Sequence, residues 1–141
     1  MPSIRESIEY ILTTDATLTG LVPAARIYSD RLPEDCTEVP ALHFDFVAGQ
    51  DNRVLMDGTL TDYIKRRYSF HIYVAEDQPD VADQIWRRLM PLLTRKLATV
   101  QGVEIKGIIP VGDFIEGGSH NQSWRHFIQD FYVHYSESWS S

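Results

Sequence analysis

The stretch PALHFDFVAGQDNRVLMDGTLTDYIKRRYSFHIYVAE, residues 40–76, decides the fold. At both of its ends apolar and polar side chains alternate with a period of two, which predicts two half-buried β-strands. Between them, Asp57-Gly58 is the two-residue signal of a hairpin turn. The side chains that we expect to face the core all have even numbers: Leu42, Phe44 and Phe46 on the first strand, and Ile64, Tyr68, Phe70, Ile72 and Val74 on the second.

One unbroken ladder from that turn is incompatible with these core faces. If Met56 pairs with Thr59, every opposed pair has an odd number sum, whereas two opposed core residues with even numbers need an even sum. An unbroken ladder would set Phe44 beside His71. The sequence therefore predicts either a β-bulge that resets the register or an arm, residues 49–62, that leaves the sheet.

The apolar tip of this stretch, Val54 to Met56, has no obvious core to enter. Apolar side chains on a projecting loop are typical of a contact with another protein. The alternative is that the tip folds back under the edge of the sheet, and the residues alone leave both open. The candidate interface consists of Asp51, Asn52, Arg53, Val54, Leu55, Met56 and Asp57.

Helices are predicted before and after this hairpin. Ser3 and Glu6 form a capping box for a helix at residues 3–13, and Asp15 caps a short second turn that Gly20 closes. A brief extended piece is expected at residues 26–28. Residues 78–98 form the main helix, with an apolar stripe at a period near 3.6: Val81, Ile85, Leu89, Leu92, Leu93 and Leu97.

Pro91 interrupts the main helix. A proline inside a helix costs about 3 kcal/mol and removes one backbone hydrogen bond. Either the helix kinks at Pro91, or Pro91 begins a separate last segment as its first residue.

The C-terminal part predicts two more strands. Residues 103–118 form an irregular extended region, in which Pro110 should lie at an edge or a bulge because it lacks the N–H that a ladder needs. Residues 125–137 form a long final strand. The order α-β-β-α-β-β predicts an α+β fold: an antiparallel four-stranded sheet with two main helices on one face and a long hairpin arm between the first two strands. We expect a single domain, 1–141, in which residues 136–141 fray.

The face of the sheet opposite the helices is a second candidate interface. Tyr73, Tyr132 and His134 point outward in the predicted pattern. Because tyrosine is enriched at subunit interfaces, an uncovered face of this kind resembles one.

No residue pattern predicts catalysis, a metal ion or a cofactor. Cys36 is the only cysteine and has acidic neighbours, without the groups that activate a thiol. The five histidines have no HExxH or comparable spacing, and the glycines form neither GxGxxG nor GxxxxGK[ST]. We therefore expect no enzyme and no cofactor. A small hydrolase that uses His43, His71 or the His120 loop is the alternative; with suitable pairing His43 and His71 are cross-strand neighbours.

The charge argues against tight binding of nucleic acid. The net charge is −7 with a pI near 5.1, and the basic residues are scattered rather than gathered in a patch. No apolar run approaches the roughly 18 residues of a membrane span. The N-terminus lacks the apolar region of a signal peptide, so we expect a cytosolic protein without a membrane partner.

Almost the whole chain resembles the small tail-completion or tail-terminator proteins of long-tailed bacteriophages and related prophages. The resemblance rests on the order and spacing of the opening amphipathic helix, the run RIYSDRLPEDCTEVPALHFDFVAG, the strand RRYSFHIYVAED, the helix ADQIWRRLMPLLTRKL and the closing HFIQDFYVHYSES. It implies a structural subunit of a hexameric ring, assembled in the bacterial host cytoplasm and placed at the tail–neck junction of the virion.

The resemblance also implies the partners of such a ring. These are further copies of the chain, the tail-tube protein whose growth the ring stops, and the head–tail connector or stopper protein that docks on it. DNA passes through the centre without specific binding. A head-side neck or stopper protein is the close alternative, and a small cytosolic binding module is a more distant one.

Overall fold

The computed structural model describes residues 3–34, 36–56, 59–94, 97–117 and 124–136, and it describes only the backbone of residues 50–56, 59–63 and 98. Residue 57 of the candidate arm interface and residues 137–141 of the expected frayed tail lie outside the described residues.

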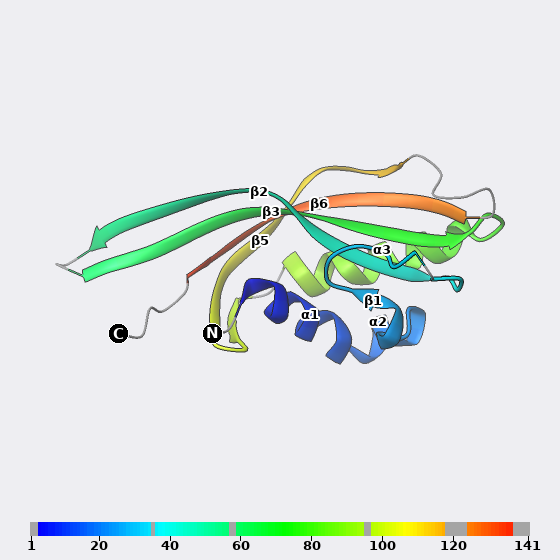
Figure 1. Ribbon diagram of the computed structural model, residues 1–141, viewed down its shortest axis with the longest axis horizontal. Coiled ribbons are helices and arrows are strands. Elements are labelled where there is room, and N and C mark those ends of the chain that lie inside the picture. The colour runs from blue at the N-terminus through cyan, green and yellow to red at the C-terminus, as the bar shows by residue number, and fades with distance from the viewer. Residues whose placement is uncertain (1–2, 35, 57–58, 95–96, 118–123, 137–141) are drawn as a thin grey trace.

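The described residues form one six-stranded mixed sheet with the strand order β1-β2-β3-β6-β5-β4 (Figure 1). Its strands are β1 (Ile27–Tyr28), β2 (Ala41–Met56), β3 (Thr59–Ala75), β4 (Ala98–Val100), β5 (Val103–Glu116) and β6 (Trp124–Ser136). β1 runs parallel to β2, and the other pairs are antiparallel. The prediction of four antiparallel strands is therefore wrong in number and in direction. β1 and β4 are two and three residues long, too short to show an alternating pattern in the sequence.

Three helices cover one face of the sheet: α1 (Ile4–Thr14), α2 (Ala16–Leu21) and α3 (Pro79–Thr94) (Figure 1). A single 3₁₀ turn, η1 (Ala24–Arg26), leads from α2 into β1. α1 begins where the capping box predicts, because the Ser3 hydroxyl accepts the Glu6 N–H at 3.1 Å. α2 begins at Asp15, whose Oδ2 accepts the Leu18 N–H at 2.8 Å.

α3 continues through Pro91 to Thr94, so the interpretation of Pro91 as the start of a separate segment is wrong. The apolar stripe of α3 is buried at Ile85, Leu89 and Leu93. Leu97 does not belong to it. It lies beyond the end of the helix with 73% of its surface exposed, because three residues past the last turn the helical period no longer sets the direction of a side chain.

The core lies between the helices and the even-numbered face of the hairpin. Phe44 and Phe70 are opposite each other in the ladder, both fully buried, with their rings stacked at 5.5 Å. Phe131 on β6 packs edge-on against Phe70 at 5.2 Å. Ile8 and Leu12 of α1 and Leu89 of α3 are buried in the same cluster. The predicted core faces are confirmed on these strands except at Phe46, which the pattern assigned to the core and which is half exposed.

The predicted register break is confirmed as a β-bulge at Val47. Phe46 pairs with Tyr68 and Ala48 pairs with Arg67, so Val47 is the extra residue. Beyond the bulge the ladder runs without another shift to Met56 and Thr59. The pairing of β3 with β6 ends at Ile64 and Tyr135, so residues 52–56 and 59–63 form a two-stranded ribbon, which we call the arm. It projects beyond the helical layer (Figure 1).

β5 is irregular, as predicted, with register shifts between Ile105 and Gly107 and between Val111 and Ile115. Pro110 pairs with Phe131 on the β6 side and lies past the three residues that pair with β4. On the β4 side Pro110 therefore has no paired strand among the described residues, and its missing N–H costs no hydrogen bond there. This confirms the prediction that Pro110 lies at an edge.

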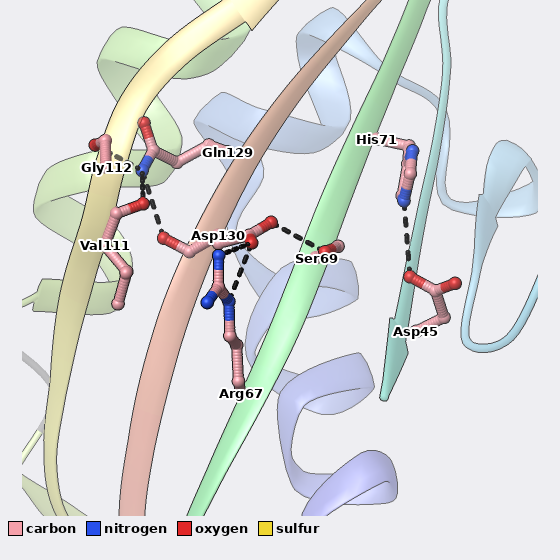
Figure 2. Close-up of polar contacts among 8 residues, drawn as sticks. All are labelled: Asp45, Arg67, Ser69, His71, Val111, Gly112, Gln129 and Asp130. Carbon is pink, nitrogen blue, oxygen red and sulfur yellow. Dashed lines mark hydrogen bonds and ion pairs between the residues drawn. The ribbon is translucent and has the colours of Figure 1, made fainter. Parts of the chain in front are cut away.

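Gln129 supports the second irregularity of β5 from within the core, where it is 2% exposed. Its Nε2 donates to the carbonyls of Val111 and Gly112 at 3.3 Å each (Figure 2). Its Oε1 accepts the Trp86 Nε1–H at 3.2 Å. Gly112 has φ +72°, a backbone conformation that a residue without Cβ adopts without strain. The buried Gln129 amide thus donates hydrogen bonds to backbone carbonyls at the point where the ladder is interrupted.

No helix among the described residues is both long and apolar enough to cross a lipid bilayer.

Candidate functional site

The base of the arm carries exposed apolar side chains next to a pocket. Phe46 and Val47, at the bulge, are 50% and 51% exposed. Beside Phe46 a pocket of about 300 Å³ opens between the start of α1, the residues after β1 and the hairpin. Arg5 and Asp30 line it together with Arg66, whose guanidinium lies 5.1 Å from the centre of the Phe46 ring. An apolar surface rimmed by both signs of charge is typical of a protein contact.

The arm interface predicted from the sequence begins beyond this base. The backbone of Asp51 to Met56 forms the β2 strand of the ribbon and pairs with residues Ile64 to Thr59. Their side chains lie outside the description, so the role of these side chains as an interface stays a prediction. The structure adds Phe46 and Val47, which sequence analysis missed because Phe46 was assigned to the core.

The second candidate interface, on the outer face of the sheet, requires one correction. Tyr73 is only 4% exposed, because Leu32 and the other residues that lead from β1 to β2 cover this end of the face. The prediction that Tyr73 is exposed is therefore wrong. Tyr132 and His134 are half-buried and lie farther along the face. Lys65 Nζ sits 4.1 Å above the Tyr132 ring, and burial, together with Lys65, lowers the pKa of His134.

In the middle of the outer face, Arg67, Ser69 and Asp130 form a charged cluster (Figure 2). Arg67 Nε donates to Asp130 Oδ2 at 2.8 Å, and the Ser69 hydroxyl donates to Oδ1 at 2.6 Å. Hydrogen bonding to Asp130 raises the pKa of Arg67. Because each partner of the cluster is satisfied, it joins β3 to β6 and offers no reactive group.

Histidines from three strands gather farther along the same face. His43 on β2 and His71 on β3 are opposite each other, with parallel rings 4.2 Å apart, so the suggested cross-strand neighbours are confirmed. His71 Nδ1 lies 2.7 Å from His126 Nε2 on β6. His71 Nε2 lies 3.3 Å from Asp45 Oδ1, as Figure 2 shows. Tyr73 stacks on His126 at 4.5 Å and on His43 at 5.5 Å. We call His43, Asp45, His71 and His126 the histidine cluster.

Burial controls protonation in the histidine cluster. It lowers the pKa of His71 although Asp45 raises it, and it raises the pKa of Asp45, helped by Asp30 and Asp130, although His71 lowers it. Both directions favour the uncharged forms over an ion pair. His71 is therefore a neutral imidazole at neutral pH, with one nitrogen able to accept.

No pattern in the sequence indicated that Asp45 and His126 lie beside His43 and His71. They belong to the cluster because β2 and β6 flank β3 in the register that the bulge sets. Ser69, which lies on the same face of β3, donates its hydroxyl to Asp130 and not to a histidine of the cluster.

Comparison with known proteins places the fold. No protein-family model matches the sequence, and no curated protein matches it. The structure is similar to a chain in the solved structure of the virion of a native gene transfer agent (GTA) particle, with a TM-score of 0.67 and 10% sequence identity over 95% of both chains. At that identity the similarity concerns the fold alone: over nearly its full length, this chain folds like a virion protein.

Proposed function

We propose that this chain is a structural virion protein of the tail terminator type. In this role six copies form a ring that caps the tail tube, stops its polymerisation and presents a surface to the neck, while DNA passes through the centre. The observation that carries the proposal is the similarity of fold to a GTA virion chain over 95% of both chains.

Two pairs of exposed apolar side chains, one toward each edge of the sheet, support a ring. Phe46 and Val47 lie on β2, toward the β1 edge, and Ile109 and Ile115 lie on β5, toward the β4 edge, with 54% and 56% of their surfaces exposed. A closed ring needs two different surfaces that meet head to tail. In the proposed ring, the β2 surface of one copy contacts the β5 surface of the next.

Charge supports the passage of DNA. Six copies of a chain with a net charge of −7 carry −42. An acidic ring repels phosphates, so DNA slides through rather than binds. The arm is the part that we assign to the tail tube or to the neighbouring subunit.

Native mass spectrometry tests the proposal directly. The protein is measured alone and with its tail-tube protein, and we expect six copies of the chain either alone or on tube ends. Deleting the gene should leave unjoined heads and tails of abnormal length in electron micrographs. A stable monomer under both conditions, together with normal virions after the deletion, overturns the proposal.

Two single-surface variants test the head-to-tail arrangement. Val47→Asp blocks the β2 surface, and Ile109→Asp blocks the β5 surface. Each variant alone should be monomeric, whereas a mixture of the two should give heterodimers, because one intact interface remains and cannot propagate. Thr17→Asp, an exposed change on α2, which packs mainly against α1 and α3, is the matched control and should still form rings.

The second candidate is a head-side stopper protein, which the same fold and ring would suit. Gold labelling in electron micrographs of separated heads and tails distinguishes the two. A label on tails supports the terminator, and a label on heads supports the stopper.

A further inference from the structure

The histidine cluster on the outer face has a geometry that the proposed ring does not use. Three of its side chains, His43, Asp45 and His71, offer ligand atoms that all lie within 4.8 Å of one another. We propose that these three residues bind a divalent transition-metal ion, with Zn²⁺ as the best match.

The distances are close to those of a metal site. In a tetrahedral zinc site with bonds of about 2.0–2.2 Å, neighbouring ligand atoms lie roughly 3.4 Å apart. His71 Nε2 and Asp45 Oδ1 are already 3.3 Å apart. The His43 ring is stacked almost parallel on the His71 ring, so His43 must turn about its Cβ–Cγ bond before its in-plane lone pair points at the same ion.

The donor set selects the class of ion. Two imidazoles and one carboxylate suit borderline ions such as Zn²⁺, Co²⁺ and Ni²⁺, whereas Mg²⁺ and Ca²⁺ prefer oxygen ligands alone. The lowered pKa of His71 keeps its imidazole neutral, as a ligand must be. Asp30 and Asp130, which raise the pKa of Asp45, add negative potential that favours a cation.

A second layer of side chains holds the ligands in position. With His71 Nε2 on the metal, its Nδ1 carries the proton and donates to His126 Nε2 at 2.7 Å. Tyr73 stacks closely on His126 and holds that ring in place, whereas its contact with His43 is looser. Such support reduces the rearrangement that binding requires.

The site is reachable from solvent on one side. The side chain of Asp45 is 40% exposed, whereas that of His71 is 16% exposed and His43 is buried. An ion therefore enters past Asp45, and water completes its coordination, as in zinc sites with three protein ligands.

Titration of tag-free, EDTA-treated protein with ZnCl₂ tests the site by calorimetry, and Co²⁺ reports the geometry through its visible absorption. We expect one Zn²⁺ per chain and the spectrum of four-coordinate Co²⁺. Asp45→Asn, which keeps the shape of a half-exposed side chain, should raise the Kd for Zn²⁺ at least about tenfold. His71→Gln should do the same, and His126→Gln should raise the Kd about 10–100-fold as the loss of a positioning residue.

His134→Gln is the matched control, because His134 lies on the same face of β6 but outside the cluster. It should leave the Zn²⁺ affinity and stoichiometry unchanged. The proposal is overturned if Zn²⁺ binds no more tightly to the parent than to folded Asp45→Asn protein, or if His134→Gln weakens binding as much as His71→Gln. Neither outcome bears on ring formation, which the native mass measurement tests separately.

Discussion

Arg88 and Asp15 join the two helical segments of the chain through a single carboxylate. Arg88 Nε, on α3, donates to Asp15 Oδ2 at 2.8 Å, and the same oxygen accepts the Leu18 N–H that begins α2. The side chain of Asp15 is 13% exposed, so water competes weakly for it. One residue thus caps a short helix and fixes it to the main helix.

Replacing Asp15 should separate these two roles. Asp15→Ala removes the cap and leaves Arg88 without its carboxylate, and we expect the free energy of unfolding to fall by about 2 kcal/mol. Asp15→Asn keeps an acceptor for Leu18 and loses only the charge, so its cost should stay below about 1 kcal/mol. Urea denaturation of both variants, and of each combined with Arg88→Ala, measures the coupling. Equal costs for Ala and Asn would show that the cap contributes nothing.

Deleting Val47 should change the arm without unfolding the protein. Because Phe46 pairs with Tyr68 and Ala48 with Arg67, removal of Val47 leaves every other pair of the ladder in register. It removes the local bend and twist that a bulge imposes, and so redirects the arm. We expect a small change in Tm but loss of ring or tube assembly in native mass spectrometry. Val47→Ala, which keeps the bulge, is the control for the lost side chain.

Replacing Gln129 should destabilise β5. Gln129→Met preserves volume but leaves the carbonyls of Val111 and Gly112 and the Trp86 N–H without this amide. Buried polar groups that lose their partners cost about 1–3 kcal/mol. Urea denaturation measures the loss, and hydrogen exchange should show it concentrated in β5. Trp86→Phe removes the indole donor and part of a half-buried ring but leaves the amide on both carbonyls, so it should reduce the protection of β5 less; an equal loss of β5 protection in the two variants would contradict this account.

Tyr73 should make the protein sensitive to alkali. Burial, together with Asp45, raises the pKa of Tyr73 from 10.0 to about 12. The folded protein therefore holds this proton to a higher pH than the unfolded chain does. The stabilisation is complete below pH 10 and is lost as the pH rises to about 12, by about 1–3 kcal/mol.

Tyr73→Phe removes this titration and supplies its control. Its stability should decline less than that of the parent between pH 10 and 12 in urea denaturation. The ultraviolet absorption of tyrosinate should lose a late-titrating component in the same variant. Parallel stability curves for the parent and the variant would refute the assignment.

The sequence contained enough to derive the hairpin and a break in its register, with a β-bulge as one of two alternatives. The core residues of both strands have even numbers, whereas the turn requires opposed pairs with an odd sum. Only a register with an extra residue on one strand satisfies both conditions, and in the structure Val47 is that residue. The capped helices followed for a similar reason, because Ser3 and Asp15 are local signals that need no tertiary context.

The sequence did not reveal contacts between residues that lie far apart in the chain. β1 and β4 are too short for a periodic pattern, and they pair only because other elements bring them to the sheet edges. The burial of Tyr73 depends on Leu32, which an irregular connector carries over the sheet. His126 entered the histidine cluster through the register of β6 on β3, which no residue near His126 specifies.

Because of the bulge at Val47, the length of the arm can change without a change in the fold of the domain. Since it fixes the register on both of its sides, residues added or removed in opposed pairs beyond Asp51 and Ile64 leave every core pair unchanged. Each residue added to both strands lengthens the ribbon by about 3.4 Å, and steps of two keep the same side chains on the same face. The molecule therefore has an adjustable reach: selection can lengthen or shorten the arm without altering the hydrophobic interior.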